Sequence, residues 1–402
     1  MKKTAMSSRE RMLATLKRQP HDHVPFSPYI GQGPWWPEPL FWRGQLERAE
    51  RMLELGLDPA IDVWLPSPEP HPDVKIKTWR DTTSGAEPML TKEYHTPAGV
   101  LRQTVSETDD WCSSWHCHWI PTTFSVEKRN HYNMELIDDF NIPRRTEPWV
   151  KGIEDLEKLR YLIRLPEGHV LDEWRMDAQR AKEFAEKHGL LLQSRRTIVG
   201  DAFQWFCDIS DFAVWMIEKP EFVKEFLGIF QEWALGLTKL ALETGVDVVQ
   251  RRGWYEIPAF WGPKYFKEYL VPLIEEETRL VHDAGKIHCY LLPEGQGAYA
   301  SVLKDMSVDV LMGIDPRMLH GGDMISLYER LGEHKAFWGG VNAEVTLESG
   351  DTVLIDKAVK EAIGMLGGRQ GFILGAFLFQ QITAKSILSM IDAWKKYRQE
   401  YS

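Results

Sequence analysis

The sequence predicts an α/β fold, a closed (β/α)8 barrel of the TIM type with a segment of short strands and loops inserted after the second strand. Short runs that are apolar on both faces alternate with helical segments, as in a parallel sheet covered by helices. Eight such runs occur in 402 residues, which suits one barrel with an insertion. An open doubly wound sheet is the alternative. No Gly-x-Gly-x-x-Gly follows the first run, which counts against a dinucleotide fold.

The elements follow from local signals in chain order. A first helix is expected from Ser7, because Ser7 and Glu10 have the spacing of a capping box. The expected strands are His23–Ile30, Ala60–Trp64, Leu190–Ser194, Asp247–Arg252, Lys286–Leu292, Val308–Asp315, Ala336–Asn342 and Gly371–Phe377. The further helices expected are Leu46–Leu55, Ile153–Leu162, Met176–His188, Phe212–Ile217, Pro220–Thr244, Pro263–Ala284, Ala298–Met306, Ile325–Leu331, Asp356–Leu366 and Ala384–Arg398.

One segment, 67–148, interrupts this alternation. It is rich in proline, threonine and tryptophan, and it contains strand-like pieces at Val74–Thr78 and Val100–Val105. We expect it to be an insertion within a single domain that covers residues 1–402.

Composition narrows the class of protein. The net charge of −11 argues against nucleic acid and against an anionic membrane surface as partners. Because the residues from Met1 onward run directly into a polar helical segment, we expect no signal peptide, and the apolar runs are too short to span a bilayer. Four cysteines in a chain of this size are not a disulfide framework, so we expect a cytoplasmic protein. Seventeen tryptophans suit a pocket for a flat or apolar ligand, or simply a bulky core.

His288 is the first candidate for a working residue. It lies in a short apolar run entered from a helix that ends at Gly285, and polar groups toward the C-terminal end of barrel strands often carry the chemistry. The alternative is a core histidine that hydrogen-bonds a neighbour. Asp315, which follows another strand, could orient His288 or could cap its own turn.

Other polar residues at strand ends could bind a substrate. Arg251 and Arg252 could hold a carboxylate in paired hydrogen bonds, although strand alternation aims only one of them inward; a salt bridge between loops is the alternative. Glu256 could be a ligand, a base or a solvated loop acid. Asn342, Gln380 and Gln381 could bind substrate or nearby backbone.

Aromatic residues could wall the pocket. The four candidates are Trp35, Trp36, Trp64 and Trp254, and packing beneath the insertion is the alternative for them. A cluster of Cys112, His116, Cys117 and His118 lies in the insertion. Its spacing is irregular for a metal motif, so a packed aromatic insertion is favoured over a metal site.

The order and spacing of several motifs resemble the uroporphyrinogen decarboxylase superfamily, which includes corrinoid-dependent methyltransferases. The motifs are Ser8–Leu16 with Val24-Pro25-Phe26, Thr96–Arg102, Gly152–Arg160, Lys219–Val223, Thr244–Asp247, Tyr265–Pro272, His282–His288, Gly339–Asn342 and Gly371–Leu374. The resemblance implies a distorted (β/α)8 barrel with its site at the C-terminal mouth. Because family members often pair, it also implies a homodimer as a candidate assembly.

The departures from the family's motifs restrict the reactions that the resemblance implies. Tyr29–Trp36 lacks the Arg-x-x-x-Arg of true decarboxylases, and Trp64-Leu65-Pro66 stands in place of Phe-Ser-Asp, which argues against porphyrinogen decarboxylation. Of the His-x-Cys…Cys zinc motif, His288 alone matches: Tyr290 replaces the first cysteine and the second falls near Leu378. Cys289 should point to the other face of its strand.

The resemblance therefore implies a methyltransferase that moves a methyl group from a small methylated substrate, for example an aryl methyl ether, to a corrinoid carried by a partner protein. Either a zinc ion on His288 with Glu256 or Glu294 would polarise the leaving oxygen, or His288 or Tyr290 would protonate it. The alternatives are a decarboxylase or lyase of a small carboxylate, anchored by Arg251 or Arg252, and a non-catalytic ligand-binding relative.

Overall fold

The computed structural model describes residues 6–28, 44–83, 85, 87–108, 134–139, 141–377 and 382–399. Contacts divide the chain into two compact units, each built from separate stretches. The first consists of Met1–Leu65, Trp174–Arg196 and Thr238–Ser402, and the second of Pro66–Glu173 and Thr197–Leu237. The expected division into one domain, 1–402, with an insertion at 67–148 stays a prediction.

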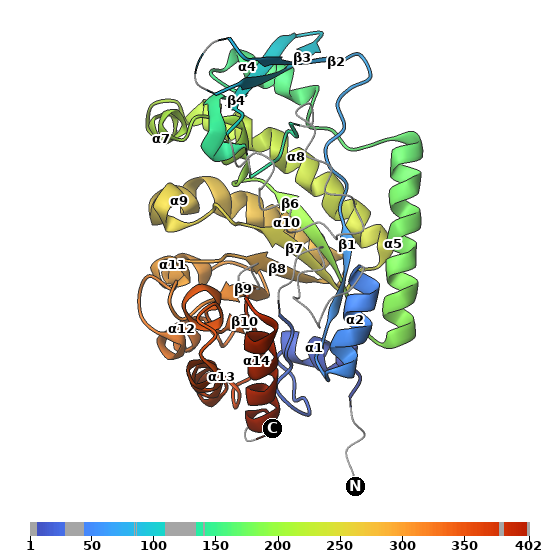
Figure 1. Ribbon diagram of the computed structural model, residues 1–402, viewed down its shortest axis with the longest axis vertical. Coiled ribbons are helices and arrows are strands. Elements are labelled where there is room, and N and C mark those ends of the chain that lie inside the picture. The colour runs from blue at the N-terminus through green and yellow to red at the C-terminus, as the bar shows by residue number, and fades with distance from the viewer. Residues whose placement is uncertain are drawn as a thin grey trace. The chain divides into compact units, whose positions relative to one another are not determined.

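The first unit is organised around a curled, seven-stranded parallel sheet, which confirms the α/β class. Its order is β1-β6-β7-β8-β9-β10-β11, and Figure 1 shows strands β7 to β10 following one another with helices α9 to α13 between and around them. The strands are β1 Ala60–Trp64, β6 Leu191–Ile198, β7 Val248–Arg252, β8 Ile287–Leu291, β9 Val310–Ile314, β10 Ala336–Gly340 and β11 Phe372–Gly375.

Helices follow these strands as the alternation predicts. They are α1 Ser8–Leu16, α2 Gln45–Glu54, α9 Pro258–Tyr265, η2 Phe266–Leu270, α10 Val271–Asp283, α11 Gln296–Leu303, α12 Met324–Leu331, η3 Ala343–Leu347, α13 Thr352–Leu366 and α14 Ala384–Tyr397. The Ser7–Glu10 capping box of α1 is present. The expected helix Pro263–Ala284 is divided into α9, the π-helical turn η2 and α10, with Gly262 at a φ of 56° inside α9.

The first expected strand, His23–Ile30, is reduced over its described residues 23–28 to a single parallel bridge between Phe26 and Leu374. Pro25 and Pro28 flank this point, and proline has no N–H to extend a ladder. Residues 23–28, which we call the Phe26 segment, nevertheless join both edges of the sheet. Ser27 N donates to Leu374 O on β11, and Asp58 N, two residues before β1, donates to Phe26 O.

The second unit contains a four-stranded antiparallel sheet in the order β2-β3-β4-β5. Its strands are β2 Lys75–Asp81, β3 Met89–Thr96, β4 Gly99–Ser106 and β5 Arg145–Glu147. Its helices are η1 Ile142–Arg144, α4 Glu154–Arg160, α6 Ala202–Phe206 and α7 Ile209–Glu218. The long helices α5 Gly168–His188 and α8 Pro220–Thr244 each contribute residues to both units. Across the described residues, no helix combines the length and apolar character needed to cross a bilayer.

The apolar core of the first unit shows which side of each strand faces inward. Met12 and Leu16 of α1 pack in one buried cluster with Cys289. The other buried members, from the strands, are Leu191, Val248, Ile287, Leu291, Val310, Met312, Ala336, Trp338 and Ile373. Because side chains alternate along a strand, His288 and Tyr290 lie on the opposite face of β8 from Cys289.

Asp58 is expected to be a main support of this fold. Its carboxylate is completely buried, accepts from the Arg11 guanidinium and from Phe26 N, and so ties α1 and the Phe26 segment to the start of β1. Asp58→Ala should lower the free energy of unfolding by about 3 kcal/mol, because one donor of the largely buried Arg11 guanidinium and the Phe26 amide lose their acceptor. Urea unfolding measures this loss.

The control is Asp73→Ala, whose side chain is 71% exposed. We expect a change within about 0.5 kcal/mol there. Equal unfolding midpoints for the two variants would contradict the role given to Asp58.

Candidate active site

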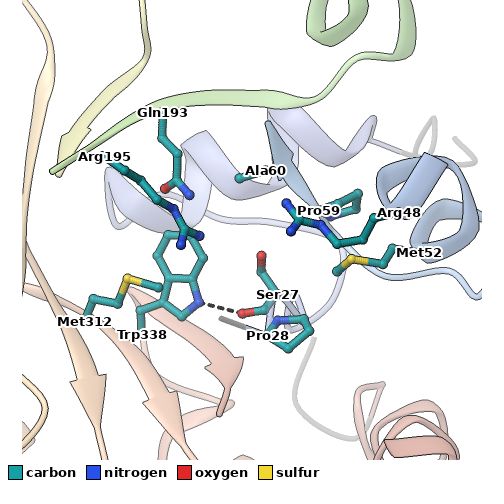
Figure 2. A pocket seen from close by; sticks show the side chains of 10 residues that line it. All are labelled: Ser27, Pro28, Arg48, Met52, Pro59, Ala60, Gln193, Arg195, Met312 and Trp338. Atoms are coloured by element: carbon teal, nitrogen blue, oxygen red, sulfur yellow. Dashed lines mark hydrogen bonds between the residues drawn. The ribbon is translucent and has the colours of Figure 1, made fainter. Parts of the chain in front are cut away.

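A small cleft opens on the inner face of the sheet. The space it leaves is small and partly open to solvent. Strands β1, β6, β9 and β10, helix α2 and the Phe26 segment supply its walls. The lining residues are Ser27, Pro28, Arg48, Met52, Pro59, Ala60, Gln193, Arg195, Met312 and Trp338. Figure 2 shows the guanidinium groups of Arg48 and Arg195 and the hydroxyl of Ser27 turned toward the space between them.

A buried carboxylate, Asp62, organises the polar wall of the cleft. Its Oδ1 accepts from Arg195 Nε at 2.8 Å and from Gln193 Nε2 at 2.7 Å, while Arg48 Nη2 approaches Oδ2 at 3.5 Å. The side chain of Asp62 is 1% exposed, and those of Arg48 and Arg195 are 4% and 6% exposed. Removing a carboxylate from water is costly unless it is paired, so this cluster holds its members in one arrangement.

Strand alternation explains how these residues meet. Asp62 pairs in parallel register with Gln193, and Arg195 lies two residues further on the same face of β6. The Oε1 atom of Gln193 is buried and has no hydrogen-bond partner among the described residues. Such an acceptor at the wall of a cleft is a candidate contact for a ligand.

Both arginines are cationic at neutral pH. Burial lowers the pKa of the Arg48 guanidinium to about 10; the Asp62 carboxylate opposes this shift and the Arg195 charge adds to it. Among the described residues that line the cleft, two are basic and none is acidic. The cleft therefore offers guanidinium groups that can hold a carboxylate or stabilise negative charge.

Trp338 forms one wall of the cleft and is held by its own hydrogen bond. Its Nε1 donates to Ser27 O at 2.7 Å. Gly375 makes this approach possible, because a Cβ there would lie 2.9 Å from Ser27 O and 3.1 Å from Trp338 Cδ1. A side chain at this position would displace the indole or the Phe26 segment.

A second hollow adjoins the cleft, and we call it the apolar hollow. It is lined by Met312, Gly313, Ile314, Asp315, Trp338, Gly339, Val341, Ala376 and Phe377. It shares Met312 and Trp338 with the cleft. Trp254, predicted to wall a pocket, packs against the same core and meets Phe377 at a ring-centroid distance of 5.3 Å.

The structure brings the predicted residues Asp315 and Asn342 together at this hollow. Asn342 Nδ2 donates to Asp315 Oδ2 at 2.9 Å, and Arg317 N donates to Asp315 Oδ1 at 2.8 Å. Burial raises the pKa of Asp315, although these two hydrogen bonds act against the shift. Asn342 Oδ1 also accepts from the backbone N–H groups of Val345 and Thr346 in η3. Part of its role is therefore the binding of nearby backbone, the alternative to substrate binding.

Arg251 and Arg252 point to opposite faces of β7, as alternation predicts. Arg251 is completely buried between two carboxylates and donates to Glu256 and Glu277, at 3.0 Å each. Burial acts to lower the Arg251 pKa, but these carboxylates raise it overall. Tyr290 lies in this network too and donates to Glu256 at 2.6 Å. Arg252 is half-buried, and its guanidinium lies over the ring of Trp254 at 5.9 Å.

His288 lies away from both hollows. It is completely buried, its Nδ1 pairs with the Thr278 hydroxyl at 2.7 Å, and its Nε2 lies 3.9 Å from Glu277. Burial lowers the His288 pKa to about 4, with Glu277 acting in the opposite direction. His288 and Tyr290 therefore face the helices, and Asp315 does not contact His288. The alternative interpretation, a core histidine bonded to a neighbour, describes this geometry.

The zinc ligands considered from the sequence do not fit a metal ion. Both oxygens of Glu256 are engaged, by Arg251 and Tyr290, and Glu294 lies beside His320 at 3.9 Å instead of beside His288. Within the described part of the chain, no group of three or more histidine, cysteine, aspartate or glutamate side chains is arranged to hold a metal ion.

Several expected site residues lie outside the described residues: Trp35, Trp36, Gln380, Gln381, Cys112, His116, Cys117 and His118. Trp64 is described; it ends β1, and the Arg195 guanidinium lies 5.4 Å from its ring centre. The residues that sequence reasoning missed are Ser27, Arg48, Asp62, Gln193, Arg195, Met312 and Trp338. An acid inside the apolar run Ala60–Trp64 was the available signal for Asp62.

Comparisons with known proteins agree with this fold. Residues 206–397 match the family model for uroporphyrinogen decarboxylase. The resemblance predicted from the sequence is thus confirmed. A solved methyltransferase from Methanosarcina mazei has a TM-score of 0.55 and 16% identity, with 98% of this chain and 99% of that chain covered. This likeness supports a methyltransferase-like fold.

Two further solved structures are similar over parts of the chain. A B12-independent methionine synthase from Shewanella sp. W3-18-1 has a TM-score of 0.38 and 10% identity over 58% of this chain and 69% of that chain. The 3-keto-D-glucoside 4-epimerase of E. coli has a TM-score of 0.37 and 11% identity over 61% of this chain and 93% of that one. Curated protein sequences give no match.

The position of His288 predicts an effect on stability with pH. Its pKa is about 4 in the fold against an ordinary 6.5, so the folded state binds fewer protons than the unfolded state between these values. The neutral His288 ring therefore contributes fully to the free energy of unfolding above pH 6.5. This contribution, roughly 3 kcal/mol, is lost as the pH falls toward 4. His288→Gln should flatten the dependence of unfolding free energy on pH in this window, measured by urea unfolding.

The same variant separates a structural role from a catalytic one. Once folded at neutral pH, His288→Gln should retain most of the activity, because residue 288 touches neither hollow. A hundredfold loss of turnover in a fully folded variant would restore His288 to the reaction.

Proposed function

We propose that this chain is a cytoplasmic (β/α)8-barrel enzyme that moves a methyl group from a small methylated substrate to a corrinoid carried by a partner protein. The Phe26 segment would take the place of the first barrel strand, because it bonds both edges of the sheet. The likeness in fold to a methyltransferase along nearly the whole chain supports this reading.

The observation that carries the proposal is the cluster of Arg48, Asp62 and Arg195 at the cleft. Methyl transfer from an ether leaves an oxygen that develops negative charge, and an alkoxide or phenoxide leaves poorly unaided. Guanidinium groups that are already fixed by a buried carboxylate can stabilise such charge without reorganising. Asp62 then acts as a positioning residue, through Arg195 and Gln193.

A proton must also reach the leaving oxygen. In the proposed step the C–O bond breaks, the methyl group passes to the reduced corrinoid, and the oxygen keeps the electron pair. Among the described residues that line the apolar hollow, Asp315 is the one ionisable side chain, and burial raises its pKa, which favours the protonated form. Asp315 would supply the proton and regain one from solvent. His288 and Tyr290 are replaced in this role because they face the helices.

The second candidate is a decarboxylase or lyase of a small carboxylate. The same two arginines favour it, since a guanidinium pair can anchor the carboxylate beside the bond that breaks. The anchor would be Arg48 with Arg195 in place of Arg251, which is enclosed by Glu256 and Glu277. Release of carbon dioxide without methyl transfer would select this reaction, and tight binding without turnover would indicate a non-catalytic relative.

Asp62→Asn tests the cluster. The substitution keeps the shape of the side chain but removes the charge that orients both arginines, so we expect kcat/KM to fall about a hundredfold, the scale for a misplaced catalytic group. The assay mixes the protein with methoxylated aromatics and a reduced corrinoid protein and follows the demethylated product. Near-UV circular dichroism verifies that the variant is folded.

The matched control is Asp73→Asn, in an exposed turn of the second unit. It should leave kcat/KM unchanged. Unaltered kinetics in a folded Asp62→Asn enzyme would remove the cluster from the reaction.

A further inference from the structure

The four-stranded sheet of the second unit has one long open edge, strand β2. Among the described strands, β2 (Lys75–Asp81) pairs with β3 alone, and five of its seven residues are exposed. The strand at the opposite edge, β5, has only three residues. An edge strand presents backbone N–H and C=O groups on its outer side, and natural proteins keep such edges short or cover them. Strand β2 is the edge of this sheet where another strand could be added.

The side chains of β2 add apolar surface to this edge. Ile76 is 51% exposed and Trp79 is 39% exposed, and alternation places them on opposite faces of the strand. The Trp79 ring already lies beside a cation of its own chain, the Arg102 guanidinium, at 5.8 Å. Large apolar side chains on a long edge strand favour pairing with another strand. A partner strand would therefore gain both backbone hydrogen bonds and apolar contact here.

The sequence of β2 is complementary to itself in antiparallel pairing. In the register that pairs all seven of its residues, Thr78 lies on a twofold axis and meets Thr78 of the second copy. Lys75 then lies opposite Asp81 of the second copy, and Lys77 lies opposite Trp79 of the second copy. The first is an opposite-charge pair and the second a cation–π pair. Because of the twofold axis, each pair occurs twice.

The charges of β2 favour this register and this partner. A shift that places Lys77 on the axis brings two lysines face to face, and like charges directly opposite each other are destabilising. A shift that places Trp79 on the axis leaves Lys75 and Ile76 unpaired. The whole chain has a net charge of −11, so two copies repel each other over most of their surfaces. Strand β2 is an exception, with three basic residues and one acidic residue.

We propose that two copies of this chain associate through β2, in antiparallel register about Thr78, so that their four-stranded sheets join edge to edge into one continuous sheet. The twofold axis closes this contact, so the product is a dimer and not a filament. The proposal is independent of the reaction proposed for the cleft, because every member of the contact belongs to the second unit.

A charge exchange tests the register, with sedimentation velocity of the full chain from low to high micromolar concentration as the measurement. We expect a monomer–dimer equilibrium for the unmodified chain. Lys75→Asp alone and Asp81→Lys alone should each raise the dimer Kd by about tenfold or more, because each places like charges opposite one another at two symmetric positions. The double variant, Lys75→Asp with Asp81→Lys, exchanges the two partners and should recover most of the affinity.

The matched control is Lys357→Asp in α13 of the first unit, where the side chain is 70% exposed. It should leave the dimer Kd unchanged. Circular dichroism verifies that each variant is folded. A chain that stays monomeric throughout the concentration range would overturn the proposal. A dimer that is indifferent to Lys75→Asp, or a folded double variant that dissociates as readily as the single variants, would overturn it too.

Hydrogen–deuterium exchange of the unmodified chain tests the same contact without a substitution. The backbone amides on the outer side of β2 should exchange more slowly at concentrations that favour the dimer, because pairing protects them from solvent. Exchange in β2 that is the same for monomer and dimer would place the interface elsewhere and contradict the proposal.

Discussion

The structure of the candidate site depends on one constraint, the burial of the Asp62 carboxylate. A charged oxygen inside a sheet is stable only when donors surround it, and here Arg195, Gln193 and Arg48 take up those positions. The need to satisfy Asp62 brings together side chains from β1, β6 and α2, which are far apart in sequence. The guanidinium groups are therefore held in place before any ligand arrives.

The two faces of the sheet use charge in different ways. On the helix-facing side, Arg251 is enclosed by Glu256 and Glu277, and His288 is kept neutral by burial. These groups satisfy one another and are sealed from solvent, as structural ion pairs are. On the inner side, Arg48 and Arg195 border empty space that reaches solvent. Access to a cleft thus distinguishes groups suited to binding from groups suited to support.

Much of the fold could be predicted because apolar periodicity marks strands and helices directly. Seven of the eight expected strands are present, and the eighth is limited to a bridge at Phe26 by the prolines on either side. The site was harder to predict, because the inward face of a strand depends on its neighbours. The alternation of side chains along a strand correctly predicted that Arg251 and Arg252 lie on opposite faces of β7. It could not predict which face His288 occupies, because that depends on the core that packs around Cys289. Ending the third expected strand at Ser194 also hid Arg195, which β6 carries to the cleft.

The most direct measurement of the central claim is a crystal structure of the protein soaked with a methoxylated aromatic compound. The account predicts ligand density against Trp338, with an oxygen of the ligand within hydrogen-bond distance of Arg48 or Arg195. Ligand density beside His288 and Glu277, with the cleft between Arg48 and Arg195 empty, would contradict it.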